Sequence, residues 1–237
     1  MCDTCGCGDT NIVSVDVHER ILAKNDRTAL HNREHFTERG TLAVNLMGSP
    51  GSGKTAVLEA TARVIRSRIV GIAGDLATDR DERRLRAAGI HSVTINTGSM
   101  CHLDADLVHH ALHDFDWRDA AYLFIENIGN LVCPAVYDLG QHVNVVALSV
   151  TEGEDKPLKY PVMFQKADLV LITKVDLLSH LPRVSLTSLI DSIERVMPAA
   201  AVIPVSAESG FGFDQWSTWL EERRAKVAPA PVEVGKG

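Results

Sequence analysis

Short runs of apolar residues alternate along this chain with segments in which apolar positions recur at helical spacing. Apolar runs rich in β-branched residues are typical of strands buried on both faces of a parallel sheet. Helical segments are predicted at 54–66, at 81–89 and from about residue 104. The runs that predict strands lie at 42–47, 68–75, 91–97, 121–127, 144–151, 168–174 and 201–207. The pattern predicts the α/β class, with a mostly parallel sheet flanked by helices.

The two ends of the chain depart from this alternation. Residues 1–11 are rich in Gly and Cys without periodicity, and we interpret them as a flexible arm. From Val15 to about Arg39, apolar residues at helical spacing predict one or two amphipathic helices. After Lys226 the sequence is rich in Pro and Gly, which predicts disorder. We expect an arm at 1–11, helices at 12–40, the main α/β domain at 41–226 and a tail at 227–237.

Composition and charge exclude several classes of protein. The chain has 237 residues, of which 45% are hydrophobic, as in a globular protein with a substantial core. The net charge of −7 argues against a nucleic-acid-binding surface. No apolar run is long enough to span a membrane, and the N-terminus has no secretory signal pattern. We therefore expect a cytoplasmic protein without a nucleic-acid or membrane partner, in which thiols stay reduced.

A phosphate-binding motif lies between the first predicted strand and the following helix. The motif is GSPGSGKT: Gly48, Ser49, Pro50, Gly51, Ser52, Gly53, Lys54 and Thr55. Its glycines let backbone N–H groups surround phosphate oxygens at a helix N-terminus. Lys54 is expected to neutralise the β- and γ-phosphates, and the Thr55 hydroxyl to bind Mg²⁺. The alternative is a glycine turn without a ligand, and the strand and helix on either side favour the nucleotide site.

Two later motifs bear on the choice of base. The candidate residues are Thr173, Lys174 and Asp176 in TKVD, and Ser206 and Ala207 in SAE. The first resembles the guanine-reading NKxD motif, in which the carboxylate accepts hydrogen bonds that adenine does not offer. The second resembles the SAK loop beside the guanine carbonyl, with Glu208 in place of lysine. A Lys–Asp pair after a strand is often only a capped turn, but both motifs in order after a P-loop favour GTP over ATP.

Two carboxylates are candidates for the phosphate side of the site. Glu126 ends a predicted strand, where P-loop proteins place the acid that holds Mg²⁺ directly or through water. Asp75 ends another strand and opens GDLATDRD, a polar loop suited to a switch that orders around Mg²⁺ and the γ-phosphate. Either acid could instead cap the next helix.

Cysteines supply a second set of candidate ligands near the same edge. Cys101 and His102 follow one predicted strand and Cys133 follows another. Loops that leave parallel strands meet at one edge of the sheet, so these three side chains could converge near the nucleotide. Two thiolates and one imidazole suit Zn²⁺ or Ni²⁺ but leave a tetrahedral site open. Two facing copies could complete it, which makes a metal-bridged homodimer a hypothesis; the alternative is one buried cysteine in each loop with an unrelated histidine.

Three further cysteines stand within the first seven residues. Cys2, Cys5 and Cys7 could form a disulfide, a redox pair or a metal-binding arm. A reducing compartment and an odd total of five cysteines weaken the disulfide interpretation. A thioredoxin-like redox pair would instead begin a helix after a strand.

The remaining histidines have no assigned role at this stage. His109 and His113 stand four positions apart on a polar helix, where they could chelate a metal but are expected to line a solvated face. His18, His31 and His35 are scattered over the N-terminal helices without a cysteine partner.

Taken together, these motifs resemble the hydrogenase nickel-incorporation GTPases, the HypB family of SIMIBI-class P-loop proteins. The likeness runs from about Val15 to Gly212 through NLMGSPGSGKT, AGDLATDRD, TGSMCHLDA, IENIGNLVCPA, TEGEDKPLKYP and TKVDLL. The N-terminal CDTCGC also matches the CxxCGC arm of some members. The resemblance implies that the arm binds nickel and that Cys101, His102 and Cys133 form the metal site of the GTPase domain.

The same resemblance implies a function and its partners. It implies slow hydrolysis of GTP to GDP, GTP-linked dimerisation, and nickel delivery to the hydrogenase large-subunit precursor with a small zinc-containing partner. Two alternatives are a urease-type nickel GTPase, which lacks the cysteine arm, and a small-molecule kinase, which normally needs an Arg-rich lid. A passive metal buffer would have no use for Asp176 or Glu126.

Overall fold

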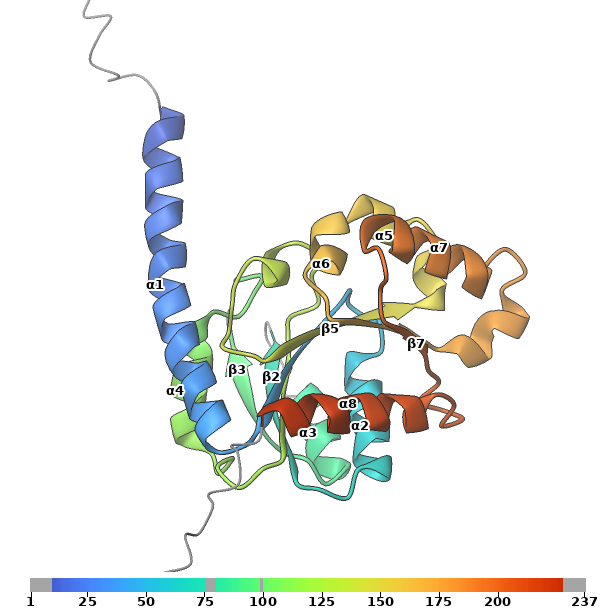
Figure 1. Ribbon diagram of the computed structural model, residues 1–237, viewed down its shortest axis with the longest axis horizontal. Coiled ribbons are helices and arrows are strands. Elements are labelled where there is room, and N and C mark those ends of the chain that lie inside the picture. The colour runs from blue at the N-terminus through green and yellow to red at the C-terminus, as the bar shows by residue number, and fades with distance from the viewer. Residues whose placement is uncertain (1–9, 76–79, 99, 228–237) are drawn as a thin grey trace, which may run out of the picture.

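The computed structural model describes residues 10–75, 80–98 and 100–227. Within these residues, seven strands form one parallel sheet in the order β3-β2-β4-β1-β5-β6-β7 (Figure 1). The strands are β1 (Leu42–Met47), β2 (Ile69–Asp75), β3 (His91–Asn96), β4 (Tyr122–Glu126), β5 (Val143–Ser149), β6 (Leu169–Thr173) and β7 (Val202–Pro204). The predicted α/β class is confirmed, and each strand lies within or beside its predicted run.

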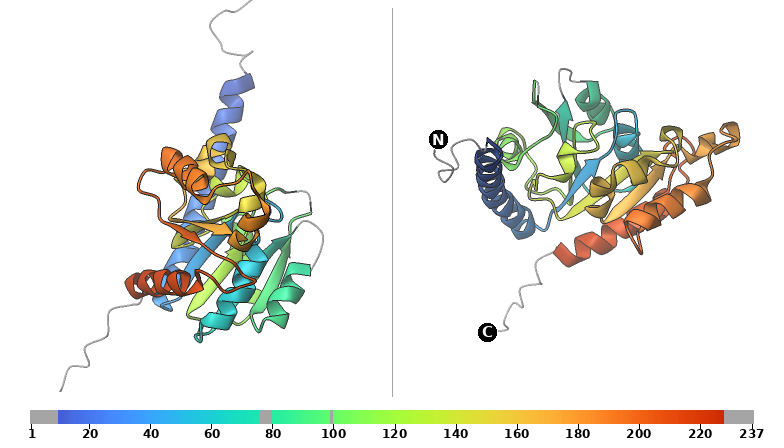
Figure 2. Two further views of the ribbon diagram at one scale, coloured as in Figure 1. Left: turned by 90° about the vertical axis from the view of Figure 1, so that its right-hand side faces the viewer. Right: turned by 90° about the horizontal axis from the view of Figure 1, so that it is seen from above.

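Helices cover both faces of this sheet (Figures 1 and 2). The helices are α1 (Thr10–Glu38), α2 (Lys54–Val64), α3 (Arg80–Ala87), α4 (Ala105–Asp114), α5 (Lys156–Lys159), α6 (Pro161–Gln165), α7 (Leu186–Val196) and α8 (Phe213–Val227). The described part of the chain also has three short 3₁₀ segments: η1 (Cys133–Ala135), η2 (Val150–Glu152) and η3 (Val175–His180). Helices α2, α3 and α8 cover one face, while α1, α4, α6 and α7 cover the other.

The central strand shows why the sequence favours this three-layer arrangement. Every residue of β1 is buried, and successive side chains of a strand point to opposite faces. Val44 belongs to the core that includes Trp216 of α8, whereas Ala43 belongs to the core that includes Phe36 of α1. A strand covered on both faces has no polar side, which explains the continuous apolar runs in the sequence.

Helix α1 is a single helix, where the sequence predicts one or two. Its C-terminal half packs beside α4, and its N-terminal half extends beyond the sheet (Figure 1). Buried Asn25 joins α1 to the domain: its amide donates to the Asp138 carbonyl at 2.8 Å and its carbonyl accepts from the Ala105 N–H at 2.9 Å. One guanidinium nitrogen of Arg33, Nη2, donates to both carboxylate oxygens of Asp138, at 2.7 and 2.6 Å. Among the described residues, no helix is long and apolar enough to cross a bilayer.

The strand register brings the functional loops to one edge. Glu126, the last residue of β4, pairs with Leu46 of β1 on one side and Ala73 of β2 on the other. It therefore lies beside the start of the loop that connects β1 to α2. On the far side of β1, Thr173 of β6 stands level with Ser149 of β5. The carboxyl ends of these strands form the crevice in which ligands of open α/β sheets bind.

Candidate nucleotide and metal site

The loop between β1 and α2 has the shape of a phosphate-binding loop because of two glycines. Gly48 has a φ of +145°, and a Cβ at this position would lie 2.4 Å from the Ala147 carbonyl oxygen. Gly53 has a φ of +95° and directly precedes the first turn of α2. Residues with side chains rarely adopt either backbone conformation, so glycine is favoured where the backbone turns toward the helix N-terminus. The free N–H groups of that first turn favour an anion.

A cavity of about 490 Å³ opens above this loop. Its lining combines the loop with acidic and basic side chains from α3 and from the ends of β2 and β4. These residues include Gly51, Gly53, Lys54, Thr55, Asp75, Asp81, Arg84 and Glu126. Most of the predicted phosphate and magnesium residues thus line one space, while Gly48, Ser49 and Ser52 do not line it.

Lys54 lies inside this cavity, and no carboxylate of the described residues contacts it directly. Its side chain is only 7% exposed, and Nζ donates to the carbonyls of Gly48 and Ser49, each at 3.2 Å. Burial lowers the pKa of Lys54, while nearby Glu126 and Asp81 oppose that shift. Among the described residues, only carbonyls accept hydrogen bonds from this buried ammonium, and an anion such as a triphosphate would stabilise its charge.

Glu126 and Thr55 form the oxygen-rich side of the cavity. The Thr55 Oγ1 lies 2.7 Å from Glu126 Oε1 and 3.0 Å from Asp81 Oδ1. Burial raises the pKa of Glu126 to about 7, against the attraction of Lys54. Within the described residues, Glu126 Oε2 and the Ser49 and Ser52 hydroxyls are buried without a hydrogen-bond partner. Hydroxyl and carboxylate oxygens are the ligands that Mg²⁺ prefers, so the donor set fits a magnesium–nucleotide complex.

A second cavity, of about 240 Å³, lies on the other side of Gly53. It is lined by residues from both candidate base motifs: Thr173, Lys174, Asp176, Val205, Ala207 and Glu208. Ser206 is fully buried, and its hydroxyl accepts a hydrogen bond from the Ser209 N–H at 3.1 Å. Ser206 therefore shapes the loop behind Ala207 and Glu208. The two motifs, 30 residues apart in sequence, form one pocket beside the phosphate loop.

Thr173 and Lys174 tie this base cavity to the phosphate loop. The Thr173 hydroxyl donates to the Ser52 carbonyl at 2.6 Å, and Lys174 Nζ donates to the Gly51 carbonyl at 2.6 Å. Lys174 also has a φ of +60°, an uncommon conformation for a residue with a side chain. Thr173 thus makes a side-chain contact with the loop although asparagine is the usual residue of the motif.

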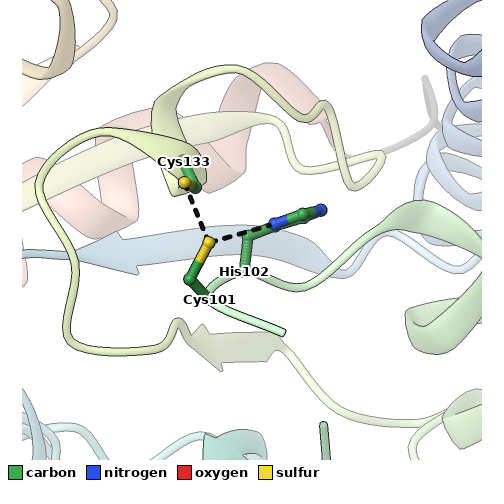
Figure 3. Close-up of side chains that lie close together, drawn as sticks. All are labelled: Cys101, His102 and Cys133. Atoms are coloured by element: carbon green, nitrogen blue, oxygen red, sulfur yellow. Dashed lines mark hydrogen bonds between the residues drawn. The ribbon is translucent and has the colours of Figure 1, made fainter. Parts of the chain in front are cut away.

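The candidate metal ligands lie together on two loops at the same edge (Figure 3). Cys101 Sγ is 2.9 Å from Cys133 Sγ and 3.8 Å from His102 Nδ1, and no disulfide joins the two sulfurs. The His102 ring stacks on Tyr137 with centroids 3.8 Å apart, and burial lowers the pKa of His102. The hydrogen bond to Cys101 raises the pKa of Cys133. The neutral imidazole has a nitrogen lone pair available, and the two thiols would lose their protons on binding Ni²⁺ or Zn²⁺.

Asn130 connects the metal loops to the phosphate loop. Its backbone forms an antiparallel bridge with Gly48, the first residue of GSPGSGKT. Its side-chain amide donates to the Cys101 carbonyl at 3.3 Å, and its side-chain oxygen accepts from the Val132 N–H at 2.9 Å. One residue therefore contacts the nucleotide loop, the loop of Cys101 and the segment that leads to Cys133.

Known proteins are similar to this chain in sequence and in fold. A profile of the CobW/HypB/UreG nucleotide-binding domain matches residues 42–204. The hydrogenase maturation factor HypB of Azotobacter vinelandii is 50% identical over 220 residues, which cover 92% of this chain and 72% of that protein. This chain belongs to the HypB family.

Solved HypB structures agree with the fold. The crystal structure of HypB from Helicobacter pylori in complex with nickel has a TM-score of 0.82 and 36% identity, covering 88% of this chain and 98% of that one. HypB from Archaeoglobus fulgidus has a TM-score of 0.79 and 40% identity, covering 86% of this chain and all of that one. The resemblance predicted from sequence motifs is confirmed, and the nucleotide-binding domain of this HypB-family chain contains Cys101, His102 and Cys133.

Some site residues were not expected from the sequence of this HypB-family protein, and others cannot be placed. Asp81, Arg84 and Asn130 were not predicted, although the charged run DRDERR and the conspicuous IENIGN stretch contain them. The cysteines of the N-terminal arm, Cys2, Cys5 and Cys7, lie outside the described residues. His31 and His35 of α1 lie near His109 of α4, which the sequence did not predict.

Proposed function

We propose that this protein is a GTP-hydrolysing nickel carrier that delivers Ni²⁺ to the large-subunit precursor of nickel–iron hydrogenase. The observation that carries the proposal is the connection through Asn130 between the phosphate loop and the cysteine loops. A change at Gly48 has a direct structural route to Cys101 and Cys133. Membership of the HypB family and the nickel complex of the Helicobacter pylori protein support nickel as the cargo.

In this proposal the buried residues of the larger cavity position the triphosphate for hydrolysis. Lys54 neutralises β- and γ-phosphate oxygens, and the N–H groups at the start of α2 donate to them. Thr55 and Glu126 would hold Mg²⁺, which would supply charge neutralisation, and Asp75 at the end of β2 lines the same cavity. Catalysis by this arrangement is mainly positioning and electrostatic stabilisation.

In the smaller cavity, we infer that Asp176 selects guanine. Its carboxylate can accept hydrogen bonds from guanine N1–H and the exocyclic amine, and Lys174 can lie over the ring with its aliphatic stem. Lys174 is already oriented toward the loop by its bond to Gly51. The Ala207 loop, held by buried Ser206, closes the opposite wall of the cavity. GTP enters and GDP leaves this cavity in the proposed cycle.

In this proposal nickel is bound by Cys101, His102 and Cys133. Ligands from outside this set complete its coordination. Three ligand atoms within 4.8 Å of one another leave coordination positions open. The apolar side chains of Met100, Val132 and Val136 near these ligands are 40–54% exposed, which supports a GTP-linked homodimer across this surface. Zn²⁺ suits the same donors.

We propose that Cys2, Cys5 and Cys7 form a second nickel site on the arm. We also propose that a small zinc-containing maturation protein assists transfer in the cytoplasm.

Nickel transfer to a purified, nickel-free hydrogenase large-subunit precursor tests this proposal. The full chain loaded with radioactive Ni²⁺ is mixed with the precursor and with either GTP–Mg²⁺ or GDP–Mg²⁺. We expect transfer with GTP, little transfer with GDP, and loss of GTP dependence in Lys54→Ala. His180→Gln, a change at an exposed residue outside both cavities, is the matched control and should behave as the unaltered protein. Equal transfer with GTP and GDP would contradict the proposal.

A further inference from the structure

The loop that closes one wall of the smaller cavity is a turn held together by its own backbone. The Ser206 hydroxyl accepts from the Ser209 N–H at 3.1 Å, and the Ser206 carbonyl accepts from the Gly210 N–H at 2.9 Å. These bonds fold the segment that directly follows β7. Two residues of this turn, Ala207 and Glu208, line the cavity proposed to bind the base.

A side chain from a distant helix also holds this turn. Arg63, in the last turn of α2, donates from Nη2 to the Ala207 carbonyl at 2.6 Å. Side chains of a helix lean toward its N-terminus, which directs the guanidinium of Arg63 toward the end of α2 that carries the phosphate loop. A hydrogen bond from an ionised donor is stronger than one between neutral groups. Arg63 therefore fixes the position of a carbonyl at the edge of the base cavity.

Helix α2 connects this turn to the phosphate side of the site. It begins with Lys54 and Thr55 and ends one residue after Arg63. Helix α8, which follows the turn, packs beside α2, and buried Trp216 of α8 donates from Nε1 to Thr61 Oγ1 at 2.9 Å (Figure 1). One helix thus sets the distance between the phosphate loop and the turn at the base cavity.

The bond from Arg63 sets the direction of the peptide group that joins Ala207 to Glu208. In a trans peptide the carbonyl and the N–H point in opposite directions, so the Glu208 N–H is directed away from Arg63. Within the described residues, neither the Ala207 N–H nor the Glu208 N–H donates to an acceptor. Guanine presents a carbonyl oxygen at C6, which accepts hydrogen bonds, whereas adenine presents an amino group there. Two available N–H donors on this wall favour guanine.

We propose that Arg63 is a positioning residue for recognition of the base. Through the Ala207 carbonyl, it orients the N–H groups of Ala207 and Glu208 toward the C6 oxygen of guanine. This inference rests on the proposed binding of GTP and GDP in the smaller cavity. The competing explanation is that Arg63, a cation in the last turn of α2, only stabilises that helix.

Binding of GDP, inosine diphosphate and inorganic pyrophosphate to the full chain tests this role. Inosine diphosphate keeps the C6 oxygen of guanine but lacks the exocyclic amine, and pyrophosphate lacks the base. Arg63→Met should weaken the binding of GDP and inosine diphosphate by the same factor, on the order of 3- to 10-fold, and leave pyrophosphate binding unchanged. Arg66→Met changes an exposed arginine near the same end of α2. This matched control should bind all three compounds as the unaltered chain does.

Three results would overturn the inference. Parental affinity of Arg63→Met for GDP would remove the role of Arg63 directly. An equal loss of pyrophosphate affinity would show that Arg63 acts only on the stability of α2. A loss for GDP without a loss for inosine diphosphate would assign the effect to recognition of the exocyclic amine, on the Asp176 side of the cavity.

Binding of ADP to the unaltered chain separates this inference from the proposed function. If ADP binds as tightly as GDP, the proposed guanine selectivity is wrong, and the role of Arg63 is wrong with it. If GDP is preferred and Arg63→Met binds GDP as the unaltered chain does, only the role of Arg63 is wrong.

A measurement on the unaltered chain does not depend on the folding of a variant. In nitrogen-labelled protein, GDP should shift the amide signals of Ala207 and Glu208, whereas pyrophosphate should leave them in place. Amide signals that stay unchanged when GDP is bound would also overturn the inference.

Discussion

The nucleotide cavity and the cysteine site lie at the same edge of the sheet but are built in opposite ways. Lys54 and Glu126 are 7% and 4% exposed, and hydrogen bonds from neighbouring residues hold the cavity in place. Cys101 is exposed and Cys133 is half-buried, and both stand on loops. Described residues of one chain line the nucleotide cavity on several sides, whereas the cysteine site brings together only three candidate ligands.

This difference fits the two tasks proposed for the edge. A buried, charge-rich cavity excludes water from a triphosphate and strengthens every electrostatic contact with it. An exposed and incomplete metal site lets another set of ligands approach, which transfer of a cation requires. Asn130 is the short connection between the two, since it contacts both Gly48 and the carbonyl of Cys101.

The largest expected effect is that one substitution, Lys54→Ala, impairs GTP turnover but not nickel binding. Lys54→Ala removes the buried charge that faces the phosphates, so GTP turnover should fall by about 100- to 1,000-fold. Nickel binding to the cysteine site with no nucleotide present should stay unchanged, because Lys54 contacts none of the metal ligands. Steady-state phosphate release and nickel titration measure the two effects. A parallel loss of nickel binding would show that the regions are not separable.

The next prediction concerns the free energy of unfolding, which should depend on pH because Glu126 is buried in the nucleotide cavity. Its pKa is about 7 in the folded protein and about 4.5 when unfolded, so the unfolded state loses its proton first as pH rises. This residue should therefore lower the free energy of unfolding progressively between about pH 4.5 and pH 7, by about 3 kcal/mol in all. Glu126→Gln should abolish that part of the pH dependence.

Urea unfolding of nucleotide-free protein in a metal chelator, at pH 5 and pH 8, measures this difference. The quantity to compare is the change in stability between the two pH values in the unaltered protein and in Glu126→Gln. Identical changes in the two proteins would mean that Glu126 is ionised throughout and that its burial has little energetic cost.

A smaller effect concerns the base cavity. Asp176→Asn should weaken GTP binding by about 30-fold, since two hydrogen bonds to a charged acceptor are lost. Xanthosine triphosphate should gain affinity, because its C2 oxygen can accept from the new amide. Competition binding with GTP, ATP and xanthosine triphosphate provides the test, and equal affinity of the unaltered protein for GTP and ATP would contradict the assignment of this cavity.

The parts of the molecule that local sequence determines were predictable. Alternating apolar runs and helical segments predicted the parallel sheet, and the conformations of Gly48 and Gly53 agree with the P-loop pattern. The proximity of Cys101, His102 and Cys133 was predictable in outline, because loops after parallel strands share an edge. These predictions depend on short spacing or on a general property of parallel sheets.

Residues whose role depends on packing between distant segments were not predictable. Asp81 reaches Thr55 only because α3 packs beside α2. The histidines of α1 and α4 are more than 70 positions apart, and only the contact between the two helices brings His31 to His109. In the sequence His109 looks like part of a solvated helix face, since nothing nearby indicates its neighbours His31 and His35 on α1.

The central claim is that nucleotide state changes the affinity of the cysteine site for nickel. The direct measurement is nickel titration of full-length protein carrying Cys2→Ala, Cys5→Ala and Cys7→Ala, first with GDP–Mg²⁺ and then with a non-hydrolysable GTP analogue and Mg²⁺. A metal indicator that competes for Ni²⁺ reports the affinity in each state. Cys133→Ala in the same background identifies the part of the signal that comes from this site.

The proposed connection through Asn130 predicts that the two nickel affinities differ by about 5- to 150-fold, equivalent to about 1–3 kcal/mol of coupling. By linkage, nickel must change the affinity for the GTP analogue relative to GDP by the same factor. The difference should disappear in Cys133→Ala. Equal nickel affinities in the two nucleotide states would contradict the account and leave a nucleotide site and a metal site that share an edge without a common mechanism.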